Sequence, residues 1–111
     1  MVKKTVVEAG IYLKECLEAR GVSVSKIILF GSQARGRAQR ESDADFIIVS
    51  EDFRGKDIFE RADLIGDVEY LTVKKYKIPM DLLLKTPEEI LKGASVTADY
   101  VEKEGVVVWA A

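Results

Sequence analysis

The sequence predicts one domain in which helices pack against a four-stranded sheet. Three observations support this prediction. The chain has 111 residues, 48% of them apolar, which is enough for one core with little room for a second. Short apolar runs alternate with segments whose apolar residues recur at helical spacing. No repeat, low-complexity tract or Pro/Gly/Ser-rich linker divides residues 1–111, so we expect a single domain.

The first predicted element is an amphipathic helix. Apolar residues recur at helical spacing between residues 6 and 17, and the segment stops at Gly21. Residues 26–30 form a short apolar run that ends at a glycine, which indicates a buried strand. Residues 31–40 then indicate a turn followed by a polar helical stretch.

The middle of the chain repeats this alternation. Residues 43–49 predict a second strand, of which residues 46–49 should be covered on both faces. After a polar loop at residues 52–56, a second helix is indicated by apolar residues at helical spacing, namely Ile58, Ala62, Ile65, Val68 and Leu71. Pro79 precedes a third predicted strand, residues 80–84.

The last helix has a clear predicted start. Thr86 suits the N-cap, Pro87 the first helical position, and Glu89 is placed to complete a capping box. This helix should run to about Glu104 and end at Gly105, before a closing strand at residues 106–109. The resulting order alternates four helices with four strands, for which a helix-covered sheet is the simplest packing.

Composition excludes several classes of function. The 17 basic and 19 acidic residues give a formal charge of −2, so no global field attracts nucleic acid or an anionic membrane. The absence of histidine excludes Ser-His and Cys-His nucleophile pairs and His-ligated zinc. Cys16 is the only cysteine, and the Met-Val-Lys-Lys start lacks the apolar run of a signal peptide or membrane helix. We therefore expect a cytoplasmic protein without a membrane partner.

Two carboxylates stand two residues apart at the start of the second predicted strand. Residues at this spacing project from the same face, so Asp43 and Asp45 should have Cα atoms about 7 Å apart and side chains able to share an ion. Mg²⁺ prefers such hard oxygen ligands and often joins them to substrate phosphates. The alternative is a solvated Ser-Asp turn that merely leads into the strand.

A third carboxylate, Asp81, lies within the apolar run of the third predicted strand. Burying a carboxylate is costly unless a cation or metal accompanies it, and the neighbours Met80 and Leu82 should face the core. Asp81 could thus supply the third wall of a metal site. The alternatives are that Asp81 marks a sheet edge or pairs with Lys85, which lies on the same strand face.

A possible phosphate site precedes the acidic pair. Gly31 and Ser32 follow a buried strand and begin a helical stretch, so backbone N–H groups and the Ser32 hydroxyl could point at a phosphate. Arg35 and Arg37 could then clamp a triphosphate, whereas Arg40 is expected at the surface. The segment is not a Walker A loop, because it lacks the lysine and hydroxyl residue that such a loop needs. An ordinary turn and a solvated helical face remain the alternatives.

Together these residues resemble a known family. Gly31-Ser32, ten intervening residues and Asp43-Ala44-Asp45 resemble the signature of the DNA polymerase β-like nucleotidyltransferase superfamily. Gly-Ser-Gln-Ala-Arg-Gly at residues 31–36 resembles its minimal nucleotidyltransferase (MNT) branch. The similarity runs from about Lys26 to the end of the chain and includes the late Asp81, Thr-Pro-Glu-Glu and the closing Glu-Gly-Val-Val-Val. The combined pattern is specific, although each piece is common.

The resemblance implies an α+β fold of the polymerase β palm type with a mixed four-stranded sheet. It implies that Asp43 and Asp45 bind a pair of Mg²⁺ ions, that Asp81 completes the metal site near the attacking hydroxyl, and that Gly31-Ser32 holds the phosphates. The expected reaction transfers a nucleoside monophosphate, AMP from ATP, to a hydroxyl and releases pyrophosphate. Positioning and charge neutralisation would supply most of the rate.

The resemblance also implies a partner. Members of this branch are typically antitoxins that modify a tyrosine of a small helical HEPN-type toxin. Larger relatives carry extra helices for the acceptor, so a partner protein or a homodimer would provide that surface here. Two alternatives stay open: a non-catalytic module that neutralises its partner by binding, and a transferase acting on a small molecule such as an aminoglycoside, or on an RNA end. The acidic balance argues against RNA.

Overall fold

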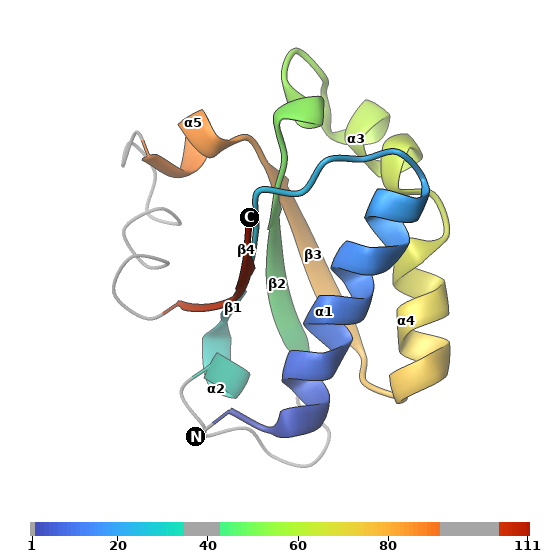
Figure 1. Ribbon diagram of the computed structural model, residues 1–111, viewed down its shortest axis with the longest axis vertical. Coiled ribbons are helices and arrows are strands. Elements are labelled where there is room, and N and C mark those ends of the chain that lie inside the picture. Colours follow the sequence, from blue (N-terminus) through green and yellow to red (C-terminus); the bar gives the residue numbers. More distant parts are fainter. Residues whose placement is uncertain (1, 35–42, 92–104) are drawn as a thin grey trace.

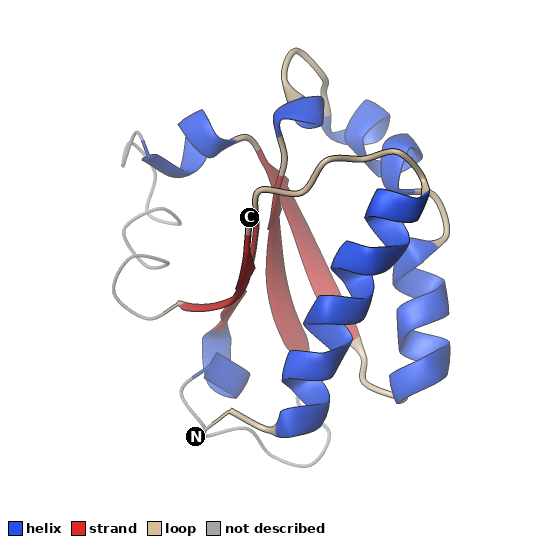
Figure 2. Cartoon of the chain, viewed as in Figure 1, coloured by secondary structure: helices blue, strands red, loops and turns tan. Residues whose placement is uncertain are grey.

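The computed structural model describes residues 2–34, 43–91 and 105–111 (Figure 1). Helices and strands alternate along most of the chain (Figure 2). The elements are, in chain order, α1 (Lys4–Ala19), β1 (Lys26–Phe30), α2 (Gly31–Ala34), β2 (Ala44–Val49), the 3-10 helix η1 (Glu51–Phe53), α3 (Ile58–Ile65), α4 (Val68–Tyr76), β3 (Met80–Lys85), α5 (Pro87–Leu91) and β4 (Val106–Ala110).

The four strands form one mixed sheet in the order β3-β2-β1-β4. β1 pairs antiparallel with both β2 and β4, whereas β2 and β3 are parallel. The parallel pair requires the chain to cross from one end of β2 back to the start of β3, and η1, α3 and α4 make this crossover. The predicted α+β fold with a mixed four-stranded sheet is confirmed.

The main core lies between the sheet and the helices α1 and α4, which cover the same face (Figure 1). α1 buries its predicted apolar stripe there, including Val6, Leu13 and Leu17. Gly10 allows the close approach of α1 to the sheet, because a Cβ atom at this position would lie 3.0 Å from a ring carbon of Phe46. A smaller apolar cluster on the opposite face centres on Ile28, Ile47 and Val49.

The predicted second helix is wrong in one respect, because it is two helices rather than one. The helical conformation is interrupted between α3 and α4 at Gly66, which has φ +56° and ψ −125°. A side chain at Gly66 would also collide with Arg20, whose guanidinium forms an ion pair with Asp67 at 3.4 Å. The apolar residues of α3 and α4 therefore do not lie on one face of a single helix. Ile58 is 73% exposed, although the helical spacing predicted that it faces the core.

The predicted start of the last helix is confirmed. Thr86 Oγ1 accepts a hydrogen bond from the Glu89 N–H at 3.2 Å, and Glu89 Oε1 accepts one from the Thr86 N–H at 2.8 Å. This reciprocal pair is a capping box, and Pro87 is the first residue of α5. Most of the predicted helix beyond α5, and of the helix predicted at residues 31–40 beyond α2, lies outside the described residues.

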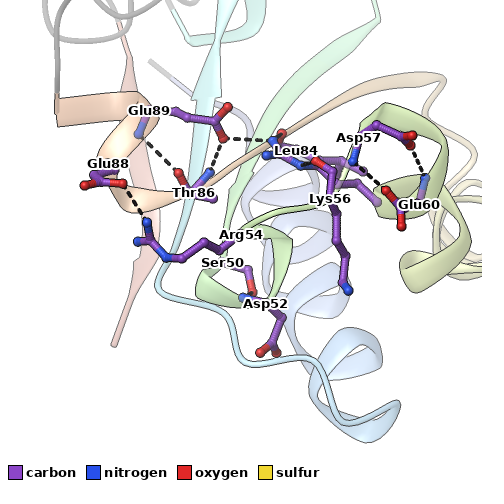
Figure 3. A network of polar contacts seen from close by, with 11 residues as sticks. Ser50, Asp52, Arg54, Lys56, Asp57, Glu60, Leu84, Thr86, Glu88 and Glu89 are labelled. Atoms are coloured by element: carbon purple, nitrogen blue, oxygen red, sulfur yellow. Dashed lines mark hydrogen bonds and ion pairs between the residues drawn. The ribbon is translucent and has the colours of Figure 1, made fainter.

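Polar contacts stabilise the end of the sheet at which β3 leads into α5 (Figure 3). Arg61, whose side chain is 11% exposed, donates to the carbonyl oxygens of Lys56 and Leu84 and to Glu89 Oε1, at 2.8–2.9 Å. Burial opposes the charge of Glu89, but the Thr86 and Arg61 donors outweigh it and lower the pKa of this carboxyl. Arg54 joins the more exposed Glu51 and Glu88. The network connects the ends of β2 and β3 to α3 and α5.

Candidate active site

The strand register brings two of the predicted acidic residues together. Asp45 lies opposite Phe30 of β1 and opposite Asp81 of β3, so one row crosses three adjacent strands. Neighbouring strands are about 4.8 Å apart and paired residues project from the same face. Asp45 and Asp81 therefore extend side by side from the sheet face opposite α1, and the exposed Asp43 directly precedes β2.

Gly31 borders this site at the end of β1. Its φ of +78° is a conformation that residues with a side chain rarely adopt. A Cβ atom at position 31 would lie 2.5 Å from Oδ2 of Asp45, which is closer than non-bonded atoms can approach. The predicted glycine turn is thus in direct contact with one of the predicted carboxylates, because β1 ends where β2 begins.

The carboxylates influence one another electrostatically. Burial raises the pKa of Asp45, and the negative charges of Asp81 and Asp43 raise it further. These are the surroundings expected where several carboxylates converge without a compensating cation. Perturbed acids of this kind often mark functional sites.

The position of Asp81 differs from the prediction. Its side chain is exposed rather than buried, because β3 is the edge strand of the sheet, although Met80 before it is buried as predicted. The argument from the cost of burying a carboxylate therefore does not apply to Asp81. The alternative that Asp81 marks a sheet edge is confirmed. The alternative of a pair with Lys85 is not, because no ion pair joins these two residues, both of which the structure describes.

The sequence prediction did not include Glu69. This residue lies in the first turn of α4, where burial and the charge of Asp81 raise the pKa of its carboxyl. Glu69 therefore adds a fourth acidic group to the surroundings of β3. The crossover through α3 and α4 brings it there, and no pattern in the sequence indicates that placement.

The donor chemistry of the site suits a hard divalent cation. Within residues 2–34, 43–91 and 105–111, no three Asp, Glu, His or Cys side chains already form a set that could hold a metal ion. However, Asp45 and Asp81 are paired across the adjacent strands β2 and β3, so rotation of their side chains could direct both carboxylates at one ion. Gly31 keeps the space beside Asp45 free of a side chain.

The other predicted site residues are only partly placed. Ser32 is the second residue of the short helix α2, directly after Gly31. Arg35, Arg37 and Arg40 lie outside the described residues. In the part of the chain that is described, no helix is long and apolar enough to cross a membrane.

Comparison with known proteins supports a specific family. A family model described as "Nucleotidyltransferase domain" matches residues 11–108. The chain is also 29% identical, over 79 residues, to the putative protein adenylyltransferase of Methanocaldococcus jannaschii. That match covers 71% of this chain but only 53% of the relative, so the chain spans about half the length of the curated protein.

Solved structures share the fold at lower identity. A toxin-antitoxin structure with AMP-PNP superposes with a TM-score of 0.64 and 22% identity, covering 92% of this chain and 73% of the other. A chain of the complex between tri-AMPylated Shewanella oneidensis HEPN toxin and MNT antitoxin gives a TM-score of 0.57, 19% identity and coverage of 94% and 71%. A putative nucleotidyltransferase from Sulfolobus solfataricus superposes with a TM-score of 0.57 and 20% identity, covering 97% of this chain and 89% of the other. At these identities the similarity establishes the fold alone.

Proposed function

Since this chain belongs to the nucleotidyltransferase domain family, we propose that it transfers AMP from ATP to a hydroxyl of a partner protein. The observation that carries the proposal is the strand register, which aligns Asp45 with Asp81 beside the turn at Gly31. The curated relative supports the choice of adenylyl transfer to protein, since its name describes a protein adenylyltransferase.

We assign the following roles to the residues of this site. Asp43, Asp45 and Asp81 would hold Mg²⁺, with Asp81 on the side of the attacking hydroxyl. The turn at Gly31-Ser32 would hold the phosphates through backbone N–H groups. Arg35 and Arg37 would clamp the triphosphate. When bound, two Mg²⁺ ions would neutralise the phosphate charge and serve both the attacking and the leaving oxygen.

The exposure of Asp81 suits the proposed role. Because β3 is the edge strand, an acceptor can approach this carboxylate from outside the sheet without any rearrangement of the core. Asp45 lies further inside, next to Gly31, where phosphates would bind. The two acids would thus separate the acceptor side from the nucleotide side.

We further propose that the acceptor is a tyrosine of a small helical HEPN-type toxin and that the chain acts as its antitoxin in the cytoplasm. Support comes from the structures with the same fold, one of which contains a HEPN toxin that carries three AMP groups. A partner protein or a homodimer would complete the acceptor surface.

A labelling experiment tests the proposal. The protein is mixed with Mg²⁺, ATP labelled at the α-phosphate and a candidate HEPN-type protein encoded beside it. We expect label on the partner, lost in the Asp43→Ala, Asp45→Ala double variant and in Asp81→Ala. A partner that binds tightly but stays unlabelled would contradict transfer and indicate neutralisation by binding. Label on an aminoglycoside or RNA end, with none on protein, would contradict the protein acceptor.

A further inference from the structure

One side of the backbone of β3 faces away from the sheet, because β3 is an edge strand (Figure 1). At its start, the Ala44 N–H donates to the Pro79 carbonyl oxygen at 2.9 Å. At its end, the Ser50 N–H donates to the Lys85 carbonyl oxygen, also at 2.9 Å. The register between these points is continuous, so the odd-numbered residues of β3 direct their backbone groups at β2. The even-numbered residues direct theirs at the free edge, namely Met80, Leu82 and Leu84.

A groove of about 280 Å³ runs along this free edge, between β3 and α3. Its apolar lining comes from residues 82–84 of β3 and from three residues of α3, namely Ile58, Ala62 and Ile65. Its charged lining is mixed, with Arg61 and Lys85 beside the single acid Glu69. Charge therefore does not select a partner for this groove.

The two ends of the groove differ. At one end, the Arg61 guanidinium donates to the outward carbonyl oxygen of Leu84 at 2.8 Å and so occupies that acceptor. At the other end, next to Asp81, the outward N–H and carbonyl groups of Leu82 have no hydrogen-bond partner among residues 2–34, 43–91 and 105–111. Free backbone groups on an edge strand are a template for one more strand.

The side chains of β3 are also less covered than those of the strand beside it. Residues 46–48 of β2 are completely buried. Their partners in β3, residues 82–84, are three leucines that are only half-buried, although they point alternately to the two faces of the sheet. A strand added along β3 would cover these leucines on both faces while it used the free groups of Leu82.

The register would continue the row of active-site residues into an added strand. Phe30, Asp45 and Asp81 lie opposite one another on β1, β2 and β3. A residue paired with Asp81 would project from the same face, with its Cβ atom about 5 Å from that of Asp81. The residues on either side of it would project to the other face, where Leu82 packs against the core cluster that includes Ile65 of α3.

We propose that this groove, which we call the edge groove, binds an extended segment of the acceptor protein as a fifth strand. The segment bonds to the backbone of Leu82, holds its hydroxyl-bearing residue opposite Asp81 and packs a neighbouring apolar side chain against α3. The inference rests on the proposed function only in identifying the bound segment as the acceptor. Recognition then depends on an extended backbone and apolar contact, and the modified residue belongs to a part of the partner outside its helices.

Amide hydrogen exchange measured by NMR tests the edge groove without nucleotide. The probe is a short capped peptide of alternating valine and threonine, with tyrosine in place of the central threonine. Its control is the same peptide with methylated backbone nitrogens, which cannot donate. We expect the first peptide to slow exchange of the outward Leu82 N–H at least about tenfold, with much smaller effects at Asp81 and Leu83, which already donate to β2. Intermolecular NOEs should place the tyrosine beside Asp81.

Variants at Leu82 separate the backbone group from the side chain. Leu82→Pro removes the outward N–H without removing a bond to β2, a position at which an edge strand tolerates proline. It should weaken peptide binding at least about tenfold, whereas Leu82→Val keeps the N–H and should bind within about twofold of the wild type. Thermal unfolding of both variants checks that they fold.

A second pair of variants tests the groove without changing β3. Ala62→Leu places extra carbon atoms in the groove and should weaken binding several-fold. Ala19→Leu makes the same change at an exposed position at the end of α1 and should have no effect.

Several results would overturn the proposal. These are equal binding of the methylated peptide, protection at β4 instead of Leu82, tyrosine NOEs away from Asp81, and unchanged binding by Ala62→Leu. Self-association through β3, with the peptide excluded, would assign the edge to a second copy of the chain instead. Because no ATP is present, a failure of AMP transfer would leave these results unchanged, so the two proposals fail separately.

Discussion

At the scale of single residues, the site depends on the absence of a side chain at Gly31, beside Asp45. The glycine has a positive φ, and its missing side chain leaves room for the Asp45 carboxylate. The sequence predicted a phosphate-binding turn here and an acidic pair nearby, but it gave no reason to place the two in contact. That contact arises from the pairing of Phe30 with Asp45.

Substituting Gly31 by alanine should therefore impair function more than folding. Gly31→Ala introduces a Cβ atom 2.5 Å from Asp45 Oδ2 and must displace that carboxylate. Gly55→Ala is the matched control, since Gly55 has a similar φ of +74° and nothing within 4 Å of its Cβ position. Both variants should lose about 1 kcal/mol of folding stability from backbone strain. Transfer activity, measured with labelled ATP, should fall at least about tenfold in Gly31→Ala alone. Equal activity in the two variants would contradict the role of Gly31.

The raised pKa of Asp45 leads to a prediction about stability and pH. A carboxyl whose pKa is raised above its ordinary value of 3.8 in the folded state favours folding less once it ionises. The free energy of unfolding should therefore decrease as the pH rises through the interval between these two pKa values. In the absence of divalent cations, Asp45→Asn should then be more stable than the wild type at pH 7, and this advantage should disappear at low pH.

Thermal unfolding in a chelating buffer measures this difference. Asp63→Asn serves as the control, because Asp63 is an exposed aspartate of α3 and should show little effect. Adding Mg²⁺ should raise the melting temperature of the wild type and not that of Asp45→Asn. A wild type that is more stable than Asp45→Asn at pH 7 without metal would show that the repulsion is absent.

At the scale of elements, α3 has two roles. Its inner side holds Arg61, which connects the end of β3 to the start of α5, while its outer side leaves Ile58 and Phe59 exposed. The break at Gly66 separates α3 from α4 and lets Glu69 lie near Asp81. The helical spacing of residues 58–71 gave no indication of these functions, because an isolated glycine is tolerated within a helical pattern.

The contribution of Arg61 can be separated from that of an ordinary surface arginine. Arg61→Met keeps much of the side-chain volume but leaves the Leu84 carbonyl and Glu89 without their donor, and should cost about 1–3 kcal/mol of unfolding free energy. Arg54→Met removes bonds to the exposed Glu51 and Glu88 and should cost clearly less. Urea unfolding of both variants measures the difference. A larger loss in Arg54→Met would contradict the account of the network.

At the scale of the whole molecule, local patterns predicted the elements better than their arrangement. The four strands, the first helix and the Thr86 capping box follow from spacing and turn chemistry. A sheet edge at Asp81 was one of the alternatives from the sequence, but the sequence could not decide for it, because an apolar run does not reveal whether its strand lies at the edge of a sheet. The position of Glu69 likewise depends on tertiary packing. The acidic residues were identifiable as candidates, but their alignment depends on the register of β1, β2 and β3.

Paramagnetic broadening by Mn²⁺ tests most directly whether these carboxylates form one metal site. In the presence of a non-hydrolysable ATP analogue, low concentrations of Mn²⁺ should broaden the amide signals of Gly31, Asp45 and Asp81 before all others. The broadening should weaken at least about tenfold in Asp45→Asn, which loses a charged oxygen ligand. If Mn²⁺ instead broadens signals elsewhere, or affects the wild type and Asp45→Asn equally, the carboxylates do not form a shared metal site.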